Sequence, residues 1–481
     1  MKLSRYTLVL TTALSLSACN MAPKYVEPQM PVPPVTPVGE AYDIAGSNGT
    51  AIDGSTAWRS FFIDEHLREI IALALENNRD LRVAMANVEK ARAQYRVQRS
   101  DRLPTIGASG SARYDKSIAT SSSSANAGGA AGTNQLSGRT DVYTASVGVS
   151  AWEVDLFGRV KNLTDAAQQN FFAVRENRNA AQTTLVAEVA SAWLLLAADQ
   201  ERLKLARDTS ETFAQTLELN RARFNAGIAS ELEVRQAQSS YDQTRSDIAQ
   251  ALTLVAQDRN ALTLLVGTDI NDSQLPVRLP PAGGTLQNLP AQISSDILLG
   301  RPDIAAAEHQ LRAANANIGV ARAAFFPNIS LTAAFGTISL GLSGLFGSGS
   351  DFWSVSPAAS LPLFDGGRNA ASLDFAKANQ LAMIATYERT IQTAFKEVAD
   401  GLARRGTIDE QQEAQRSLRE SSAIAYRLSS ARFKAGIDGF LTTLDAQRTL
   451  YAAENSLVST RLARETNAVE IYRALGGGLN E

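Results

Sequence analysis

An internal duplication is the feature that most constrains how this chain can fold. The motif Ala-Arg-Phe-x-Ala-Gly-Ile occurs at residues 222–228 and again at 431–437, an offset of 209 residues that holds over much of the chain. Two copies of one supersecondary unit predict two structural repeats. We place them at residues 58–268 and 290–481, joined by a Pro- and Gly-rich linker at residues 269–289.

Both copies show the same order of helical patterns. A helical segment ends at a proline, and further on a long helix, a glycine turn and a return helix follow one another. The expected helical segments are 64–100 and 302–324, the long helices 159–224 and 368–433, and the return helices 231–265 and 440–475. In the first long helix Val186, Val189 and Trp193 have the three-and-four spacing of a coiled-coil seam. Each long helix spans about 100 Å at 1.5 Å per residue, so the sequence predicts two long helical hairpins.

A β-hairpin is expected between the helical segment and the long helix of each copy. Apolar residues alternate with small or polar ones, as Tyr143, Ala145 and Val147 do in the first copy and Ile329 and Leu331 in the second. Strands of about ten residues with one apolar face fit membrane-spanning β-structure. A half-buried hairpin of a soluble protein fits the same pattern. The first copy also has a low-complexity loop at residues 119–138.

The N-terminus resembles a bacterial lipoprotein signal. Lys2 and Arg5 precede a short apolar stretch, and small residues lead to Cys19, the one cysteine of the chain. We therefore expect a signal peptide at residues 1–18, with N-acyl and diacylglycerol lipid on Cys19. Residue 20 is asparagine, and the resemblance implies sorting to the outer membrane. Six prolines between residues 23 and 37 predict an extended lipidated tether over residues 19–57.

Composition argues against several classes of function. The 46 basic and 49 acidic side chains give a net charge of −3, so nucleic acid is not an expected partner. His66 and His309 are the only histidines, which argues against a metal site, a cofactor and most histidine-based catalysis, and we expect no enzyme activity. Beyond the first twenty residues no uninterrupted run of 18 apolar residues occurs, so no transmembrane helix is expected.

Four strands cannot close a membrane barrel alone, because such barrels start at eight strands and an open edge in lipid leaves backbone groups unpaired. Several chains would therefore have to share one barrel. Three chains would supply twelve strands.

Four motifs together resemble the outer-membrane efflux lipoproteins of the TolC/OprM class. They are the segment 298–304, the two turns that share the duplicated motif, the segment 444–448, and the glycine-rich end 475–478. The resemblance implies a mainly α-helical chain with a small β part, in a homotrimer. The trimer would form a 12-stranded barrel in the outer membrane, continuous with a 12-helix barrel in the periplasm. It also implies docking on a periplasmic adaptor and an inner-membrane proton-driven transporter, with drugs or other toxic small molecules as cargo.

The same resemblance maps candidate site residues onto this sequence. A periplasmic constriction falls on Asp445 and Leu441, where three carboxylates around a symmetry axis would favour cations. The alternative is that Asp445 is an ordinary solvated aspartate. Thr442 stands where relatives of the TolC branch carry a second acidic residue. Glu233 maps to a gate contact, although Ser230 and Glu233 also form a capping box. The turns that would meet the adaptor are Ala226, Gly227 and Ile228 in the first copy and Ala435, Gly436 and Ile437 in the second.

Three functions remain open from the sequence. The leading one is an efflux duct, and the second is an exit duct of the same family for protein secretion. The third, from a different class, is a lipid-anchored coiled-coil scaffold in the periplasm, which would require the β-hairpins to be water-soluble.

Overall fold

The computed structural model describes residues 20–42, 56–119, 136–280, 285 and 293–479. For residues 117–119 and 136–138 it describes the backbone only. Cys19 and the expected signal peptide lie outside these residues. The described helices and strands are α2 (Trp58–Phe61), α3 (Glu65–Asn77), α4 (Arg79–Ser100), β1 (Ile106–Ala119), β2 (Leu136–Glu153), α5 (Arg159–Asn225), α6 (Glu231–Val266), α7 (Pro302–Ala323), β3 (Asn328–Ser339), β4 (Asp351–Ser360), α8 (Arg368–Lys434) and α9 (Phe440–Ala474). Short 3-10 turns lie at Glu40–Tyr42, Asp272–Gln274, Ser295–Gly300 and Leu342–Gly344.

The chain divides into two compact units that do not coincide with the two repeats. The β unit contains residues up to Val26 together with Ala91–Phe171 and Gln310–Met383. The helical unit contains Glu27–Lys90, Phe172–His309 and Ile384–Glu481. Each unit therefore takes part of each repeat.

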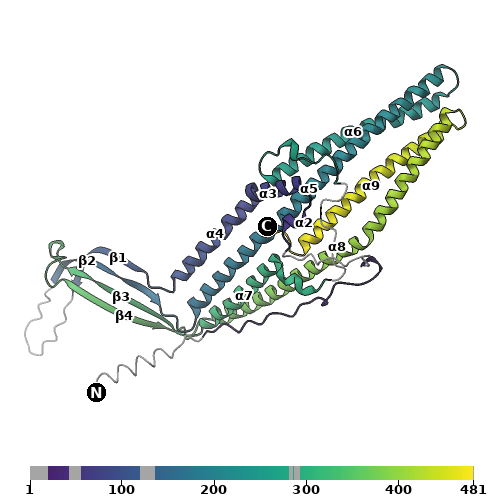
Figure 1. Ribbon diagram of the computed structural model, residues 1–481. Coiled ribbons are helices and arrows are strands. Elements are labelled where there is room, and N and C mark those ends of the chain that lie inside the picture. The colour runs from purple at the N-terminus through teal and green to yellow at the C-terminus, as the bar shows by residue number, and fades with distance from the viewer. Residues whose placement is uncertain (1–19, 43–55, 120–135, 281–284, 286–292, 480–481) are drawn as a thin grey trace, which may run out of the picture. The chain divides into compact units, whose positions relative to one another are not determined.

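The β unit carries one antiparallel sheet with the order β1-β2-β3-β4 (Figure 1). Both expected hairpins are present, and β2 pairs with β3 across the two repeats. β1 has 14 residues and β2 has 18, which is longer than the expected ten. Their pairing continues to Ala119 opposite Leu136, so these strands take up both ends of the segment expected to be a loop. Its middle, residues 120–135, lies outside the described residues.

One face of the sheet is apolar and exposed. Val147 lies opposite Phe335, and Phe335 opposite Trp353, so the three side chains form a row across β2, β3 and β4. Their exposed fractions are 51%, 66% and 76%. The neighbouring positions on the other face carry small residues, such as Ser146 and Ser354. An exposed apolar row of this kind on a sheet is typical of a surface that contacts lipid or another protein.

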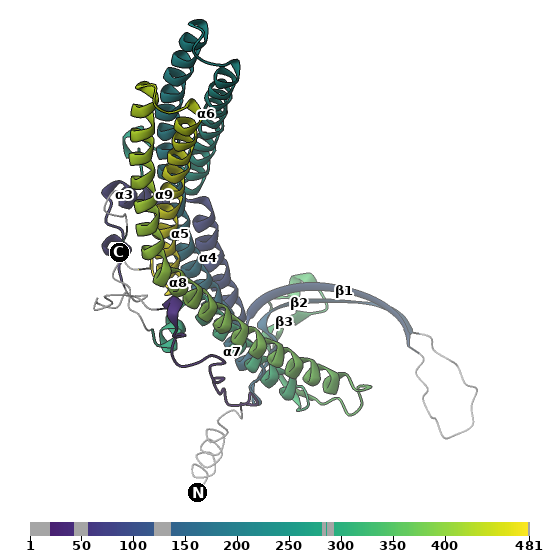
Figure 2. The same cartoon turned by 90° about the vertical axis from the view of Figure 1, so that its right-hand side faces the viewer.

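The two expected helical hairpins are present, α5 with α6 and α8 with α9 (Figure 2). The helical unit contains most of both, while the first turns of α5 and α8 belong to the β unit. The long helices α5 and α8 have 67 residues each and end within one residue of the expected positions. Val186, Val189 and Trp193 are buried, which confirms the seam. By length and composition, α5 contains an 18-residue window apolar enough to cross a membrane, but 61% of that window is buried inside the protein, as in a core helix.

The segment expected to be one helix over residues 64–100 is two helices, α3 and α4, separated by Asn78. The Asn78 side chain accepts a hydrogen bond from the Leu81 amide at 2.8 Å and donates to the Leu265 carbonyl at 2.7 Å. A side chain that bonds nearby backbone in this way competes with helix continuation and caps the next helix. The expected single helix was wrong for this reason.

Arg301, in one of the motifs shared with the efflux lipoproteins, fastens the end of α9. Its guanidinium is buried and donates to the Ala474 carbonyl at 2.6 Å. It also pairs with Asp303 at 2.8 Å and Glu397 at 3.0 Å. Two carboxylates thus compensate the buried cation, and the motif joins the start of α7 to the end of α9.

The Pro-rich N-terminal segment, for which a tether is expected, has no α-helix over residues 20–42, and several of its residues are hydrogen-bonded to the rest of the chain. In the β unit, Asn315 on α7 donates to the Pro23 carbonyl at 2.8 Å. In the helical unit, the Ser295 hydroxyl donates to the Pro33 carbonyl at 2.5 Å. The part before Glu27 is therefore bonded to the β unit, and the part after it to the helical unit.

Candidate functional site

The two helical turns of the helical unit have nearly the same backbone. Gly227 has φ 73° and Gly436 has φ 75°, the left-handed conformation that ends a helix. The Ile228 amide donates to the Arg223 carbonyl and the Ile437 amide to the Arg432 carbonyl, both at 3.0 Å. A Cβ added to either glycine would meet no atom within 4 Å, so the glycines are required for their backbone angle.

The turns present exposed apolar side chains. Ile228 and Ile437 are 65% and 64% exposed, and the adjoining alanines and glycines are exposed as well. Apolar side chains at the end of a helical hairpin can bury surface against another protein. The structure thus places all six residues of the predicted adaptor turns at exposed positions of the helical unit.

The return helices begin differently. Ser230 caps α6, and its hydroxyl accepts from the Glu233 amide at 3.3 Å, which confirms one half of the capping box. Gly439 precedes α9 and makes no side-chain cap bond. Instead, Asp438 pairs with Arg432 at 2.6 Å, and the hydrogen bond from this arginine lowers the pKa of the Asp438 carboxyl.

Leu441 and Asp445 are four residues apart on α9, so they lie on one face of that helix. Both are exposed, and within the described part of the chain no hydrogen bond or ion pair involves the Asp445 carboxylate. Glu233 is half-buried near the start of α6. The predicted constriction residues thus lie close behind the turns, Leu441 and Asp445 on one hairpin and Glu233 on the other.

An apolar cluster and a cation–π contact join the two hairpins near their turns. The cluster contains residues of all four helices, namely Phe213, Leu217, Ala237, Phe433, Phe440 and Leu444. The Arg223 guanidinium of α5 lies 4.7 Å from the ring centre of Phe433 on α8. Because these contacts connect residues far apart in the sequence, no local pattern indicated them.

Two polar contacts continue this connection between α6 and α9. Arg448 donates to the Ser240 hydroxyl at 2.7 Å, and the Tyr451 hydroxyl donates to Asp247 at 3.1 Å. Burial, together with the Asp247 carboxylate, raises the pKa of Tyr451 to about 12. Arg448 belongs to a motif shared with the efflux lipoproteins, which was the signal that could have pointed to it. These contacts fasten α9, the helix that carries Leu441 and Asp445, to its neighbour.

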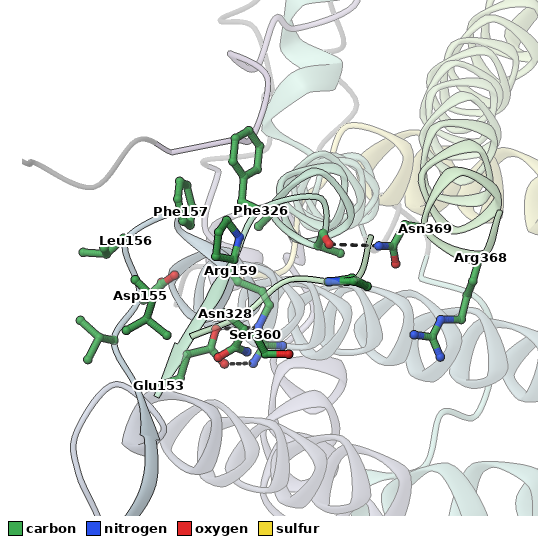
Figure 3. A pocket seen from close by; sticks show the side chains of 16 residues that line it. Glu153, Asp155, Leu156, Phe157, Arg159, Phe326, Asn328, Ser360, Arg368 and Asn369 are labelled. Carbon is green, nitrogen blue, oxygen red and sulfur yellow. Dashed lines mark hydrogen bonds and ion pairs between the residues drawn. The ribbon is translucent and has the colours of Figure 1, made fainter. Parts of the chain in front are cut away.

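The β unit has a cavity of about 550 Å³ where strands and helices meet (Figure 3). Glu153 at the end of β2 and Arg159 at the start of α5 face each other there, with Nε and Oε1 2.8 Å apart. Their charges compensate one another, so this pair stabilises the junction. Asn20 lies beside the same junction, with its Cα 3.4 Å from where a Cβ of Gly158 would be.

The described residues contain no group of three or more His, Cys, Asp or Glu side chains arranged to hold a metal ion. His66 lies 3.9 Å from Glu69, and the His309 ring lies 5.3 Å from the Phe172 ring. The glycines at the end of the chain close α9, and the Gly477 amide donates to the Tyr472 carbonyl at 3.0 Å.

Comparison with known proteins gives concordant matches. The chain matches the family described as outer membrane efflux protein over residues 70–268 and 293–477. It is 44% identical to an antibiotic efflux pump outer membrane protein, ArpC of Pseudomonas putida, over 98% of this chain and 95% of that protein. It is 41% identical to a solvent efflux pump outer membrane protein, SrpC of Pseudomonas putida, over 97% and 96%. The open-state crystal structure of the Neisseria gonorrhoeae MtrE outer membrane channel superposes with a TM-score of 0.85 at 37% identity, over 96% of this chain and 99% of that one.

Proposed function

The chain belongs to the outer membrane efflux protein family, and from this membership we infer that it is the outer-membrane channel of a tripartite efflux pump. Its cargo is drugs, solvents or other toxic small molecules, the classes named for its relatives. The observation that carries the inference is the exposed apolar row of Val147, Phe335 and Trp353, which suits a sheet facing lipid.

We propose that three copies form one duct. The sheet of a single chain has β1 and β4 at its edges. In lipid the backbone groups of these edges would be unpaired, which costs several kcal/mol per group, so pairing β4 of one copy with β1 of the next is strongly favoured. The helical hairpins of the three copies would continue the wall as a helical barrel in the periplasm.

The partners follow from the same arrangement. We propose that the turns at residues 226–228 and 435–437 contact a periplasmic adaptor, and that the adaptor links the duct to an inner-membrane proton-driven transporter. The exposed isoleucines of both turns supply apolar surface for this contact. Such a duct makes or breaks no covalent bond of its cargo, and its task is to control the passage of the cargo.

We propose that Leu441 and Asp445 form the periplasmic constriction. Three copies of Asp445 around an axis would bring like charges together and favour cations, and three copies of Leu441 one turn earlier would form an apolar collar. The Asp445 carboxylate forms no bond within the described part of the chain, which leaves it available for this role. For Glu233 the capping interaction with Ser230 is sufficient, and a gate contact is the weaker proposal.

We propose that Cys19 carries the lipid anchor. Asn20, the next residue, lies beside the junction of β2 and α5, where a membrane-spanning sheet would end. A lipid on the preceding residue, Cys19, would enter the adjacent leaflet. A Cys19→Ala variant should incorporate no radiolabelled palmitate, and label in that variant would contradict the assignment.

The function is tested in cells that lack their own outer-membrane efflux channel. Expression of this chain with its transporter and adaptor should restore resistance to antibiotics and lower the accumulation of a fluorescent drug. A chain that reaches the outer membrane in normal amounts but leaves accumulation unchanged would contradict efflux. Release of a protein substrate by such cells would favour the secretion duct.

A further inference from the structure

Two carboxyl groups meet inside the α5–α6 hairpin. Asp199 on α5 is 3% exposed, and its Oδ1 lies 2.6 Å from Nη1 of Arg202. Asp258 on α6 is within hydrogen-bonding reach of Asp199. The Oδ2 atom of Asp258 is buried, and no donor among the described residues bonds to it.

This arrangement has one cation for two acids. An ionised carboxylate only accepts hydrogen bonds, so two of them in contact repel each other unless one holds a proton. Arg202 is shared, because its Nη2 donates to the Ser459 hydroxyl of α9 at 2.8 Å.

The other charged groups nearby have partners of their own. Arg259, next along α6, pairs with Asp272 at 2.5 Å. On α3, which packs against α6, Glu69 accepts a hydrogen bond from Gln274 at 3.0 Å. Asp199 and Arg202 are therefore the charged groups that act on Asp258.

The second hairpin lacks this carboxyl pair. The repeat offset of 209 residues places Ile408 where the first copy has Asp199, and Asn467 where it has Asp258. Both are buried, and the Asn467 amide donates to the Gly401 carbonyl at 3.0 Å. The fold thus accommodates uncharged side chains at these two positions, and the pair of acids distinguishes the first hairpin.

We propose that Asp199 and Asp258 bind one proton as a pair, and that the α5–α6 hairpin is therefore held more tightly in acidic than in neutral surroundings. Such a pair makes one of the two otherwise similar hairpins responsive to pH. The proposal does not depend on what passes through the channel.

The expected direction follows from where the proton is bound more tightly. Burial, with the contact to Asp199, raises the pKa of Asp258 from 3.8 to about 6. The folded hairpin then binds more protons than the unfolded chain between these two values. Stability is therefore lost as the pH rises through about 4 to 6, and the repulsion is fully present at neutral pH.

Hydrogen exchange on the full-length trimer tests the proposal. Amides near residues 199 and 258 should exchange on the order of threefold more slowly at about pH 5 than at about pH 7.5, after correction for intrinsic rates. Amides near residues 408 and 467 serve as the internal control and should show no such difference. An equal response of the two hairpins would overturn the proposal.

Two variants separate titration from packing. Asp258→Asn copies the residue of the second repeat and should abolish the difference between the two pH values near residue 199. Asp269→Asn removes an exposed acid just beyond α6 and should leave the difference as in the wild type. A pH dependence in Asp258→Asn equal to that of the wild type would overturn the proposal. If Asp258→Asn fails to fold, the exchange measured on the unmodified protein decides alone.

Discussion

The hairpins α5–α6 and α8–α9 end in turns with the same motif and nearly the same backbone, yet the side chains of these turns have different surroundings. Phe224 and Phe433 occupy the same place in the motif. Phe224 is 44% exposed, whereas Phe433 is 3% exposed and packs in the cluster between the hairpins. The two copies therefore share the backbone of the turn, whereas the packing between the hairpins gives the two phenylalanines different burial.

The starts of the two return helices differ in a related way. α6 has a side-chain cap and two acidic residues in its first turn, and α9 has neither. A side-chain cap contributes about 1 kcal/mol and each acid about 0.3–1 kcal/mol to a helix start. The helix with the weaker start is the one that carries Leu441 and Asp445. In our account the first hairpin carries the pair of acids that responds to pH, and the second carries the constriction.

The largest expected effect on stability comes from the two phenylalanines at corresponding positions of the repeats, Phe224 and Phe433. Phe433→Ala should destabilise the helical unit by about 3–5 kcal/mol, because it leaves a cavity in the cluster. Phe224→Ala, its matched control, should cost much less, since that side chain is already half in water. Denaturant unfolding of both variants measures the difference in the free energy of unfolding. Equal losses in the two variants would contradict the unequal packing of the two turns.

A smaller effect is expected at the link between α6 and α9. Arg448→Ala removes the bonds to Ser240 and should cost about 1 kcal/mol. Because α9 would be held less firmly, we also expect the current through the channel in planar bilayers to rise. Arg235→Ala, which removes an exposed pair with Glu231 within α6, should leave the current unchanged. A current that is equally low in both variants would contradict a restraining role for Arg448.

The helix starts can be altered one at a time. Ser230→Ala should lower the stability of the protein by about 1 kcal/mol, because the α6 cap is lost. Gly439→Ser should stabilise α9 by about 0.3 kcal/mol. Gly439 already has the extended backbone of a capping residue, so serine fits there without strain. Hydrogen exchange in the first turn of each helix reports both changes. Faster exchange in α9 of Gly439→Ser would show that the weak start has another cause.

The smallest expected effect is a titration. Tyr451 has its pKa raised to about 12, so the proton is held more firmly in the folded protein than in the unfolded chain. Its contribution to stability is present below about pH 10 and is lost as the pH approaches 12. Asp247→Asn should lower this pKa only partly, because burial is the larger cause. Tyrosinate absorbance measured against pH checks this, and an unchanged titration would exclude an influence of Asp247.

Much of the fold could be predicted because the sequence contains two copies of the same order of elements. The repeat offset and the glycine turns located all four long helices to within a few residues. The break at Asn78 was missed, because it depends on a bond to Leu265, which is remote in the sequence. The contacts between the hairpins were missed for the same reason. Phe224 and Phe433 stand in almost identical local sequence, so no local pattern could have told which of them is buried.

The most direct test of the account is the conductance of the purified protein in planar lipid bilayers. We predict a cation-selective current, and a larger and less selective one in Asp445→Ala, because removal of the carboxylate ring widens the constriction and discharges it. A correctly folded trimer that conducts no ions, even with Asp445→Ala, would contradict a duct and favour a periplasmic scaffold.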